Sequence, residues 1–417
     1  MVIVLRQMKV NILNIAKKHH FVLWLIRNAN FLKGRLKYLY FYIFNKTNNE
    51  MIIFEAYMGR SFSCSPKAIY MELLKDKKYK NYKFIWAFKE PEKYKFLKRK
   101  RNTVIIKYAS SKYYRYYSKA KYWITNSRLP EVIKKRKNQV YVQCWHGTPL
   151  KKLGYDISVV GGNAMNSIND IRKKYKNDSK RYNYIISPSH FCTNKFISAF
   201  NLQRKNIIKE IGYPRDDYLI NYAVKDANRI KSKLKIPLDK KIILYAPTWR
   251  DNEHESGIGY TYQLNLDFNK LREKYSEKYI ILFKSHYFIS NYIDLSKYKG
   301  FVYNVSDYSD INDLYIISDL LITDYSSVFF DYANLKKPII FYMYDLDEYK
   351  TKLRDFYIDL SELPGPIART QKKLQKEIDG IESYEKRYLK KYEKFNKKYN
   401  YLNDGKSSKR FIKEIIK

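Results

Sequence analysis

Cysteine is scarce in this 417-residue chain, and the three cysteines that occur, Cys64, Cys144 and Cys192, are far apart. An odd number of widely spaced cysteines provides neither a disulfide framework nor a cluster of metal ligands. The chain also lacks the GxGxxG dinucleotide fingerprint, the Walker phosphate loop, the GxSxG nucleophile elbow and the HExxH zinc motif. We therefore expect a reducing, cytoplasmic setting, no metal site and no resident cofactor.

A long apolar run is absent near the start of the chain. The longest one there, residues 21–26, is too short for the core of a signal peptide or for a membrane-spanning helix. No acidic residue precedes Glu50, and apolar residues recur at helical spacing beside lysine and arginine. Basic amphipathic helices of this kind lie in the headgroup layer of anionic membranes. We predict that residues 1–50 associate with a membrane; packing of these helices on the protein body is the alternative.

Acidic side chains are outnumbered two to one, because 82 lysines and arginines face 41 aspartates and glutamates, a formal net charge of +41. Such an excess favours polyanionic partners, which include nucleic acid, an anionic membrane surface and phosphorylated substrates. The abundance of lysine and of tyrosine (44 residues) is equally consistent with the codon bias of an AT-rich genome. The charge alone does not choose among these partners.

Short β-type segments alternate with helical stretches from about residue 50, which is typical of α/β layers with parallel sheets. The expected strands form two series: 51–57, 82–88, 103–108, 122–126, 139–145 and 184–187, then 241–246, 279–284, 301–305, 320–323 and 338–342. The length of the chain also exceeds what one hydrophobic core usually organises. We predict a Rossmann-like N-terminal domain over 51–212, a Rossmann-like C-terminal domain over 213–370, and helices over 371–417.

The strand expected to end near residue 145 leads into a group of turn-forming and polar residues: His146, Gly147, Thr148, Pro149, Lys151 and Lys152. In parallel sheets, functional groups gather where strands end at their carboxyl edge. The glycine permits a close backbone approach, and the proline prevents the strand from continuing. A neutral imidazole there can act as a general base toward a hydroxyl, and the lysines can bind phosphate. A histidine that only caps a turn is the alternative.

Comparable groups follow two strands of the second series: Lys284, Ser285 and His286, and then Asp324, Tyr325, Ser326 and Ser327. His286 ends a strand in the other half of the chain from His146, so the two imidazoles are expected to oppose each other. The serines begin a helix, where hydroxyls and free backbone N–H groups can bind phosphate oxygens. Asp324 would repel phosphate and is better suited to orienting a neighbour. Serine and aspartate are also ordinary helix caps, which is the alternative.

Weaker candidates lie between and after these strands. Thr248 and Arg250 follow the strand 241–246, and Arg215 lies between the domains; arginine suits bidentate contact with phosphate. The pair Asp345 and Asp347 matches a metal-binding DxD only by pattern, and we expect solvated acids before a helix. The remaining histidines are expected to be structural or solvated: His19, His20, His190 and His254.

Five stretches together resemble the CDP-glycerol glycerophosphotransferase family, the teichoic acid primases and polymerases of Gram-positive bacteria. They occur in the family's order across roughly residues 50–360: WHGTPLKKLGYD (145–156), GYPRDD (212–217), YAPTWRD (245–251), KSH (284–286) and SDLLITDYSSVFFDYANLKKPIIFYMYDLDEY (318–349). Any one of these stretches can arise by chance, whereas five in order hardly can.

The resemblance implies a GT-B-like fold, with two Rossmann-type domains facing across a cleft. It implies transfer of glycerol phosphate or ribitol phosphate from a CDP-polyol donor to a hydroxyl of an undecaprenyl-diphosphate-linked acceptor at the cytoplasmic face of the membrane, with release of CMP. Both motif histidines are implicated in catalysis, here His146 and His286, and the donor site includes Asp324, Ser326 and Ser327. Tyr287 stands where family members often have proline, which puts the presentation of His286 in doubt.

We hypothesise that His146 takes the proton of the acceptor hydroxyl, while His286, Arg215 or Arg250 and the helix start at 326–327 stabilise charge on the diphosphate. The competing interpretations are a GT-B nucleotide-sugar glycosyltransferase, a nucleic-acid-binding protein and a non-catalytic membrane adaptor. No RRM-type signature is present, and we expect no nucleic-acid partner. The motifs do not separate glycerol from ribitol, primase from polymerase, or teichoic acid from capsule, and they leave the oligomeric state open.

Overall fold

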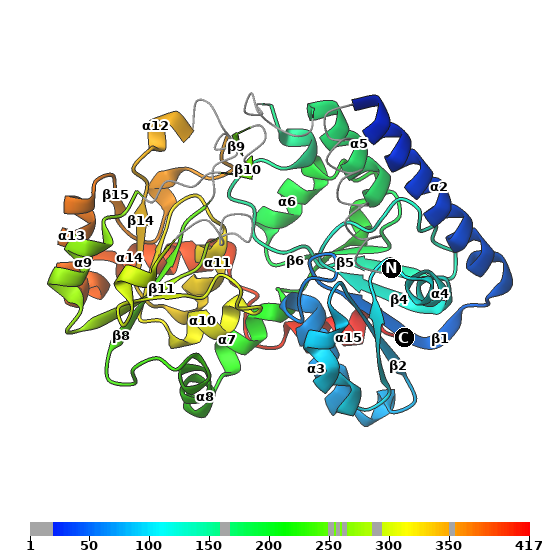
Figure 1. Ribbon diagram of the computed structural model, residues 1–417, viewed down its shortest axis with the longest axis horizontal. Helices are drawn as coiled ribbons and strands as arrows, with labels where there is room; N and C mark the ends of the chain where they lie inside the picture. The colour runs from blue at the N-terminus through cyan, green and yellow to red at the C-terminus, as the bar shows by residue number, and fades with distance from the viewer. Residues whose placement is uncertain are drawn as a thin grey trace, which may run out of the picture.

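The computed structural model describes residues 20–158, 167–248, 254–255, 259–260, 265–285, 294–349 and 355–417. Two lobes lie side by side in Figure 1, and each is built around one parallel β-sheet with helices on both faces. The predicted α/β class with two successive parallel sheets is confirmed. A short antiparallel pair, β9 (His254–Glu255) and β10 (Gly259–Tyr260), is the one other sheet in the described part of the chain.

The first lobe contains a seven-stranded sheet in the order β3-β2-β1-β4-β5-β6-β7. Its strands are β1 (Asn48–Glu55), β2 (Lys83–Phe88), β3 (Thr103–Lys107), β4 (Ala120–Thr125), β5 (Val140–Gln143), β6 (Tyr184–Ser187) and β7 (Ile208–Glu210). Ile52 and Ile53 are adjacent in β1, point to opposite faces and are both fully buried, each in a different apolar cluster. Strands covered on both faces have continuous apolar runs, and this is why the sequence revealed them.

Helices cover the two faces of this sheet. One face packs on α3 (Cys64–Lys75) and on the 3-10 segment η2 (Pro91–Arg99). The other face packs on α4 (Ser111–Lys119), α5 (Ile168–Ser179) and α6 (His190–Ala199).

The second lobe contains a six-stranded sheet in the order β12-β11-β8-β13-β14-β15. Its strands are β8 (Lys241–Ala246), β11 (Tyr279–Phe283), β12 (Val302–Asn304), β13 (Leu320–Thr323), β14 (Ile339–Tyr342) and β15 (Ile367–Ala368), and every neighbouring pair is parallel. One face packs on α8 (Val224–Leu234), α10 (Ile311–Ile317), α11 (Val328–Tyr332) and α14 (Tyr384–Tyr399). The other face packs on α9 (Phe268–Tyr275) and α13 (Gln371–Asp379).

The C-terminal helices divide between the lobes. Whereas α13 and α14 cover the second sheet, α15 (Ser407–Ile415) returns to the first lobe and lies near α3 in Figure 1. Phe411 and Ile412 join the apolar cluster beneath β1, and the hydroxyl of Tyr122 in β4 donates to the carbonyl of Lys417 at 2.7 Å. The chain therefore crosses between the lobes twice, first through η5 (Pro214–Asp216) and α7 (Asp217–Asn221), and again before α15.

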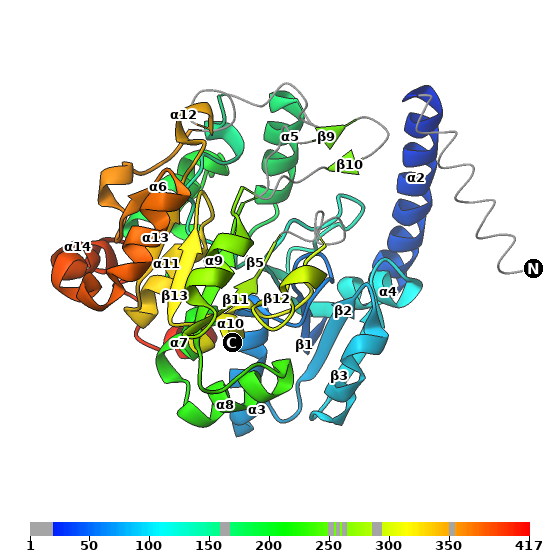
Figure 2. The ribbon, with the colours of Figure 1, turned by 60° about the vertical axis from the view of Figure 1, so that its left-hand side comes forward.

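A long helix, α2 (His20–Phe44), forms the outer edge of the first lobe in Figure 2. One side of it packs on α4: Tyr38 is fully buried, and a Cβ at Gly34 would lie 3.1 Å from the Tyr114 hydroxyl. None of the helices in the described ranges is long and apolar enough to cross a membrane. The first 19 residues of the segment that we predict to associate with a membrane lie outside the described residues.

Candidate active site

A strained turn after β5 presents His146. Trp145 has a φ of +50°, a left-handed conformation that is rare for a bulky residue. Its backbone N–H donates to the buried Gln143 side chain at 3.0 Å, and its indole lies 4.8 Å from the Phe200 ring in the core. The backbone and the indole of Trp145 are both held in this way, and Trp145 is buried whereas the next residue, His146, is exposed.

The imidazole of His146 has a defined tautomer. Nδ1 lies 2.7 Å from the carbonyl oxygen of Asn126, and because a carbonyl can only accept, Nδ1 carries the proton and Nε2 is free to accept one. Enclosure by protein atoms lowers the pKa of His146 to about 4, against the hydrogen bond to Asn126, and the charges of Arg215 and Arg128 add to the lowering. The residue is nevertheless exposed to solvent, which moderates the shift without changing its direction. The ring is therefore a neutral base at pH 7.

Asn126 is a site residue that the sequence analysis did not single out. It follows β4, and besides accepting from His146 through its carbonyl it accepts from the Tyr57 N–H through its side chain at 2.7 Å. Tyr57, Met58 and Gly59 all have positive φ, so this bond closes a left-handed turn after β1. The Tyr57 ring lies 5.8 Å from that of His146. A polar residue directly after a strand was the available signal.

The two lobes meet at the glycine after His146. A Cβ at Gly147 would lie 2.7 Å from Ser327 Oγ and 3.4 Å from Ser327 Cβ. Ser326 and Ser327 are partly exposed between β13 and α11, as the sequence predicted for the strand–loop–helix unit. The loop that carries His146 therefore lies against the loop that carries the two serines, although the two are about 180 residues apart in the chain.

Asp324 organises the second of these loops. Its carboxylate accepts from the backbone N–H of Thr248 at 2.8 Å and from that of Tyr325 at 2.6 Å. It thereby ties the end of β8 to the end of β13, which agrees with the expectation that this acid orients neighbours. The Tyr325 ring stacks on that of Tyr349 at 3.7 Å, so the loop is anchored on both sides.

Lys151 and Lys152 lie where the His146 loop contacts the second lobe. Lys151 forms a β-bridge with Phe356, and its Nζ lies 5.2 Å from the centre of the Tyr349 ring. Lys152 forms an ion pair with Asp355 at 2.9 Å. Both lysines thus take part in the contact between lobes, and their predicted role toward phosphate stays a prediction.

In three other candidates, Thr148, Lys284 and Arg215, the polar group is engaged by other protein groups. Thr148 is buried beside the Cys192 thiol. The ammonium of Lys284 donates to the carbonyls of Ser306 and Tyr308 at 2.6 and 2.7 Å, and burial lowers the pKa of this lysine to about 8.

Arg215 is the third candidate whose polar group is engaged by other protein groups. It is 4% exposed, and its guanidinium makes two hydrogen bonds to Asp331 of α11, at 2.7 and 3.0 Å. A phosphate would have to displace that carboxylate to reach the fork of the guanidinium. Its part in substrate binding stays a prediction.

The remaining predictions concern residues outside the described part of the chain, the three cysteines and the acids of the DxD pattern. His286, Tyr287, Arg250 and His19 lie outside the described residues, as does part of each motif that contains them. The three cysteines are free and buried, and no three His, Cys, Asp or Glu side chains gather as metal ligands in the described part of the chain. Asp347 is 81% exposed and paired with Arg369, so this acid is solvated, as expected.

Two parallel sheets that bring the loop carrying His146 against the loop carrying Ser326 and Ser327 define a two-lobed α/β protein whose strand-end loops face each other, the place where such folds bind ligands. The chain matches the family model described as CDP-Glycerol:Poly(glycerophosphate) glycerophosphotransferase over residues 38–417. It belongs to that family, and its fold is GT-B-like, as predicted.

Individual relatives agree with this assignment. The chain is 41% identical over 373 residues to the teichoic acid poly(glycerol phosphate) polymerase of Staphylococcus epidermidis, covering 88% of this chain and 50% of that relative. It is 41% identical over 374 residues to the polymerase of the same name from Bacillus spizizenii, covering 88% of this chain and 92% of the relative. The solved wall teichoic acid polymerase TagF superposes with a TM-score of 0.83 at 37% identity, covering 98% of this chain and 97% of that one. A variant of TagF soaked with CDPG gives a TM-score of 0.82 at 36% identity, with the same coverage of both chains.

Proposed function

We propose that this protein transfers glycerol phosphate, or ribitol phosphate, from a CDP-polyol to a hydroxyl of a membrane lipid-linked acceptor and releases CMP, in the synthesis of teichoic acid or a related cell-surface polymer. The family and the CDPG-soaked relative support the donor. The observation that carries the proposal is the neutral His146 imidazole, whose Nε2 is free while its loop lies against Ser327.

In the proposed reaction, Nε2 of His146 accepts the proton of the acceptor hydroxyl as its oxygen bonds to the phosphorus that bears the polyol. The bond from that phosphorus to the bridging oxygen of the diphosphate breaks, and its electron pair leaves with CMP. Ser326 and Ser327 offer hydroxyl donors beside this centre. His286 and Arg250 keep their predicted roles at the leaving group, and the reaction requires no cofactor.

The outer face of α2 supports attachment of the enzyme to the cytoplasmic face of the membrane. Leu25, Leu32, Leu36 and Ile43 recur at spacings of seven, four and seven, and they are 46%, 58%, 59% and 69% exposed. Such spacing places them along one side of a helix whose opposite side packs on α4. An apolar stripe with lysines beside it suits the interface of an anionic bilayer, which would bring the acceptor lipid to the first lobe.

The test is turnover by the purified enzyme with CDP-glycerol and, separately, CDP-ribitol on a synthetic lipid-linked disaccharide, with products measured by mass. The acceptor should gain polyol phosphate units with one CMP per unit. Transfer of a sugar from a nucleotide-sugar donor, with a nucleoside diphosphate as the second product, would instead establish the glycosyltransferase alternative.

A further inference from the structure

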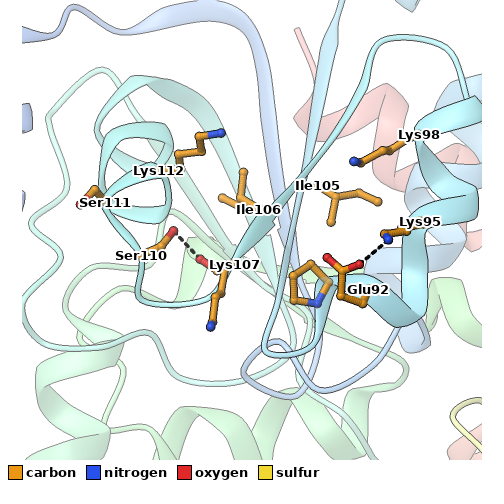
Figure 3. Close-up of a pocket in the computed structure, with 10 residues that line it drawn as sticks. Glu92, Lys95, Lys98, Ile105, Ile106, Lys107, Ser110, Ser111 and Lys112 are labelled. Atoms are coloured by element: carbon orange, nitrogen blue, oxygen red, sulfur yellow. Dashed lines mark hydrogen bonds and ion pairs between the residues drawn. The ribbon is translucent and has the colours of Figure 1, made fainter. Parts of the chain in front are cut away.

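A pocket lies far from His146 in the first lobe, at the free edge of its sheet. It has a volume of about 420 Å³, within the range of small-molecule sites. The edge strand β3 forms its floor through Ile105 and Ile106, and η2 and the first turn of α4 form its walls (Figure 3).

The walls of the pocket carry an excess of positive charge. Four lysines line it: Lys95, Lys98, Lys107 and Lys112. Glu92 is the lining carboxylate, and it pairs with Lys95 at 2.5 Å. The other three lysines are exposed and form no ion pair with any described residue. Lys98 and Lys112 extend toward each other from opposite walls in Figure 3.

The pocket shares an edge of the sheet with the catalytic histidine. Lys107 ends β3 and His146 follows β5, and in a parallel sheet all carboxyl ends lie on one edge. Between β3 and β5 lie β2, β1 and β4, so four interstrand steps separate the two sites, about 19 Å.

Cations also lie along the edge between the two sites. Lys89 follows β2, with its Nζ 5.8 Å from the centre of the Tyr108 ring, and Arg60 follows β1. The charge of Arg60 adds to desolvation in lowering the pKa of Lys89, so the two cations are close enough to repel each other. Glu90 on the same edge is paired with Lys93 at 2.9 Å, and Glu55 is buried beneath.

We propose that this four-lysine pocket binds phosphodiester groups of an acceptor that already carries polyol phosphate units, while the terminal hydroxyl of that chain reaches His146 along the basic edge. The inference rests on the proposed function, because the acceptor is then a chain of evenly spaced negative charges. Exposed ammonium groups around an open pocket suit such a ligand, since they hold phosphate without fixing one geometry. The consequence is that long acceptors bind more tightly than short ones.

Binding tests the pocket without requiring turnover. The probes are a synthetic ten-unit poly(glycerol phosphate) and glycerol phosphate itself, titrated into the full-length enzyme at low and high salt. The variant K98Q/K107Q/K112Q should bind the ten-unit probe roughly 3- to 150-fold more weakly, the sum of three individually weak exposed ion pairs. High salt should abolish the difference. The matched control K386Q/K390Q/K394Q removes three exposed charges from α14 and should bind like the wild type.

Kinetics and vesicles separate the possible sources of the phosphate. The pocket variant should raise KM for a ten-unit acceptor relative to a one-unit acceptor by the same factor. Equal binding of the ten-unit probe by the pocket variant and the wild type would overturn the proposal. The proposal would also be overturned if the pocket variant lost binding to phosphatidylglycerol vesicles but bound the ten-unit probe as the wild type does, because the pocket would then hold lipid headgroups. Wild-type enzyme that binds the probe in this pocket but does not turn over any CDP-polyol would refute the proposed function and leave the pocket standing.

Discussion

Replacing Gly147 with alanine tests whether the two lobes work in the close arrangement that the structure shows. The new Cβ would lie 2.7 Å from Ser327 Oγ and 3.4 Å from Ser327 Cβ. The φ of Gly147 is outside the left-handed region, so alanine adds no backbone strain and the effect comes from the contact alone. Overpacking of this kind typically costs about 1–3 kcal/mol, a roughly 5- to 150-fold loss of the close arrangement. Rotation of the serine hydroxyl relieves part of the contact, so we expect the lower half of that range.

The assay is CDP-glycerol turnover, with thermal unfolding measured in parallel. Gly147→Ala should lower kcat/KM and leave the melting temperature of each lobe nearly unchanged, because the contact lies between lobes and not inside a core. Ser327→Gly removes both atoms that the new methyl group meets, so the double variant should be more active than the product of the two single effects predicts. Purely additive effects, or full activity of Gly147→Ala, would refute the close approach of these loops during catalysis.

Three further predictions concern the base, a buried acid and the outer helix. His146→Ala should lose on the order of a hundred- to ten-thousand-fold in turnover. Because the pKa of His146 is lowered, wild-type kcat/KM should hold as the pH falls through 6.5 and decline only at lower pH; a decline centred on 6.5 would contradict the lowered pKa. Burial raises the pKa of Glu55 to about 7. The folded protein therefore retains a proton on Glu55 that the unfolded chain loses near pH 4.5. The free energy of unfolding should consequently fall by about 3 kcal/mol between pH 4.5 and 7. Glu55→Gln should lack that fall in a denaturant titration, whereas Glu50→Gln at an exposed position should keep it. L32E/L36E in α2 should weaken flotation with anionic liposomes by at least tenfold, because partial burial of two leucines contributes roughly 2–4 kcal/mol. The control V224E/L238E changes two exposed apolar residues of the second lobe and should float like the wild type. Equal flotation of both variants would argue against α2 as the attachment face.

The strands were predictable where both faces of the sheet are covered. The central strands of both sheets are continuous apolar runs, and each predicted range overlaps an observed strand. β7 has three partly buried residues and β15 has two residues, so neither is long enough to show a periodicity. The return of α15 to the first lobe was also not predictable, because its amphipathic face can dock on either lobe, and the choice depends on contacts with residues 350 positions away in the chain.

The site was predictable residue by residue but not as a set of contacts. Strand-end position identified His146 and Ser327 separately, and the close approach of Gly147 to Ser327 depends on how the lobes dock. Asn126 was missed because its carbonyl, which any residue could supply, is the group that holds His146. A polar residue directly after β4 was a signal for the position, whereas the residue type gave no signal for this backbone contact.

The partner of Arg215 was likewise not predictable, because a sequence does not reveal whether an arginine will bind a phosphate or a carboxylate. A buried ion pair contributes little net stability, since desolvation offsets most of the attraction, so its geometry is the better guide to its role. The two hydrogen bonds from Arg215 fix α11 relative to η5, and η5 packs on α3 of the first lobe. Ser327 immediately precedes α11, so this pair sets where the serine loop stands relative to the first lobe and therefore to His146. The arginine thus acts on the site through the distance between two loops, and this role does not require it to touch the substrate.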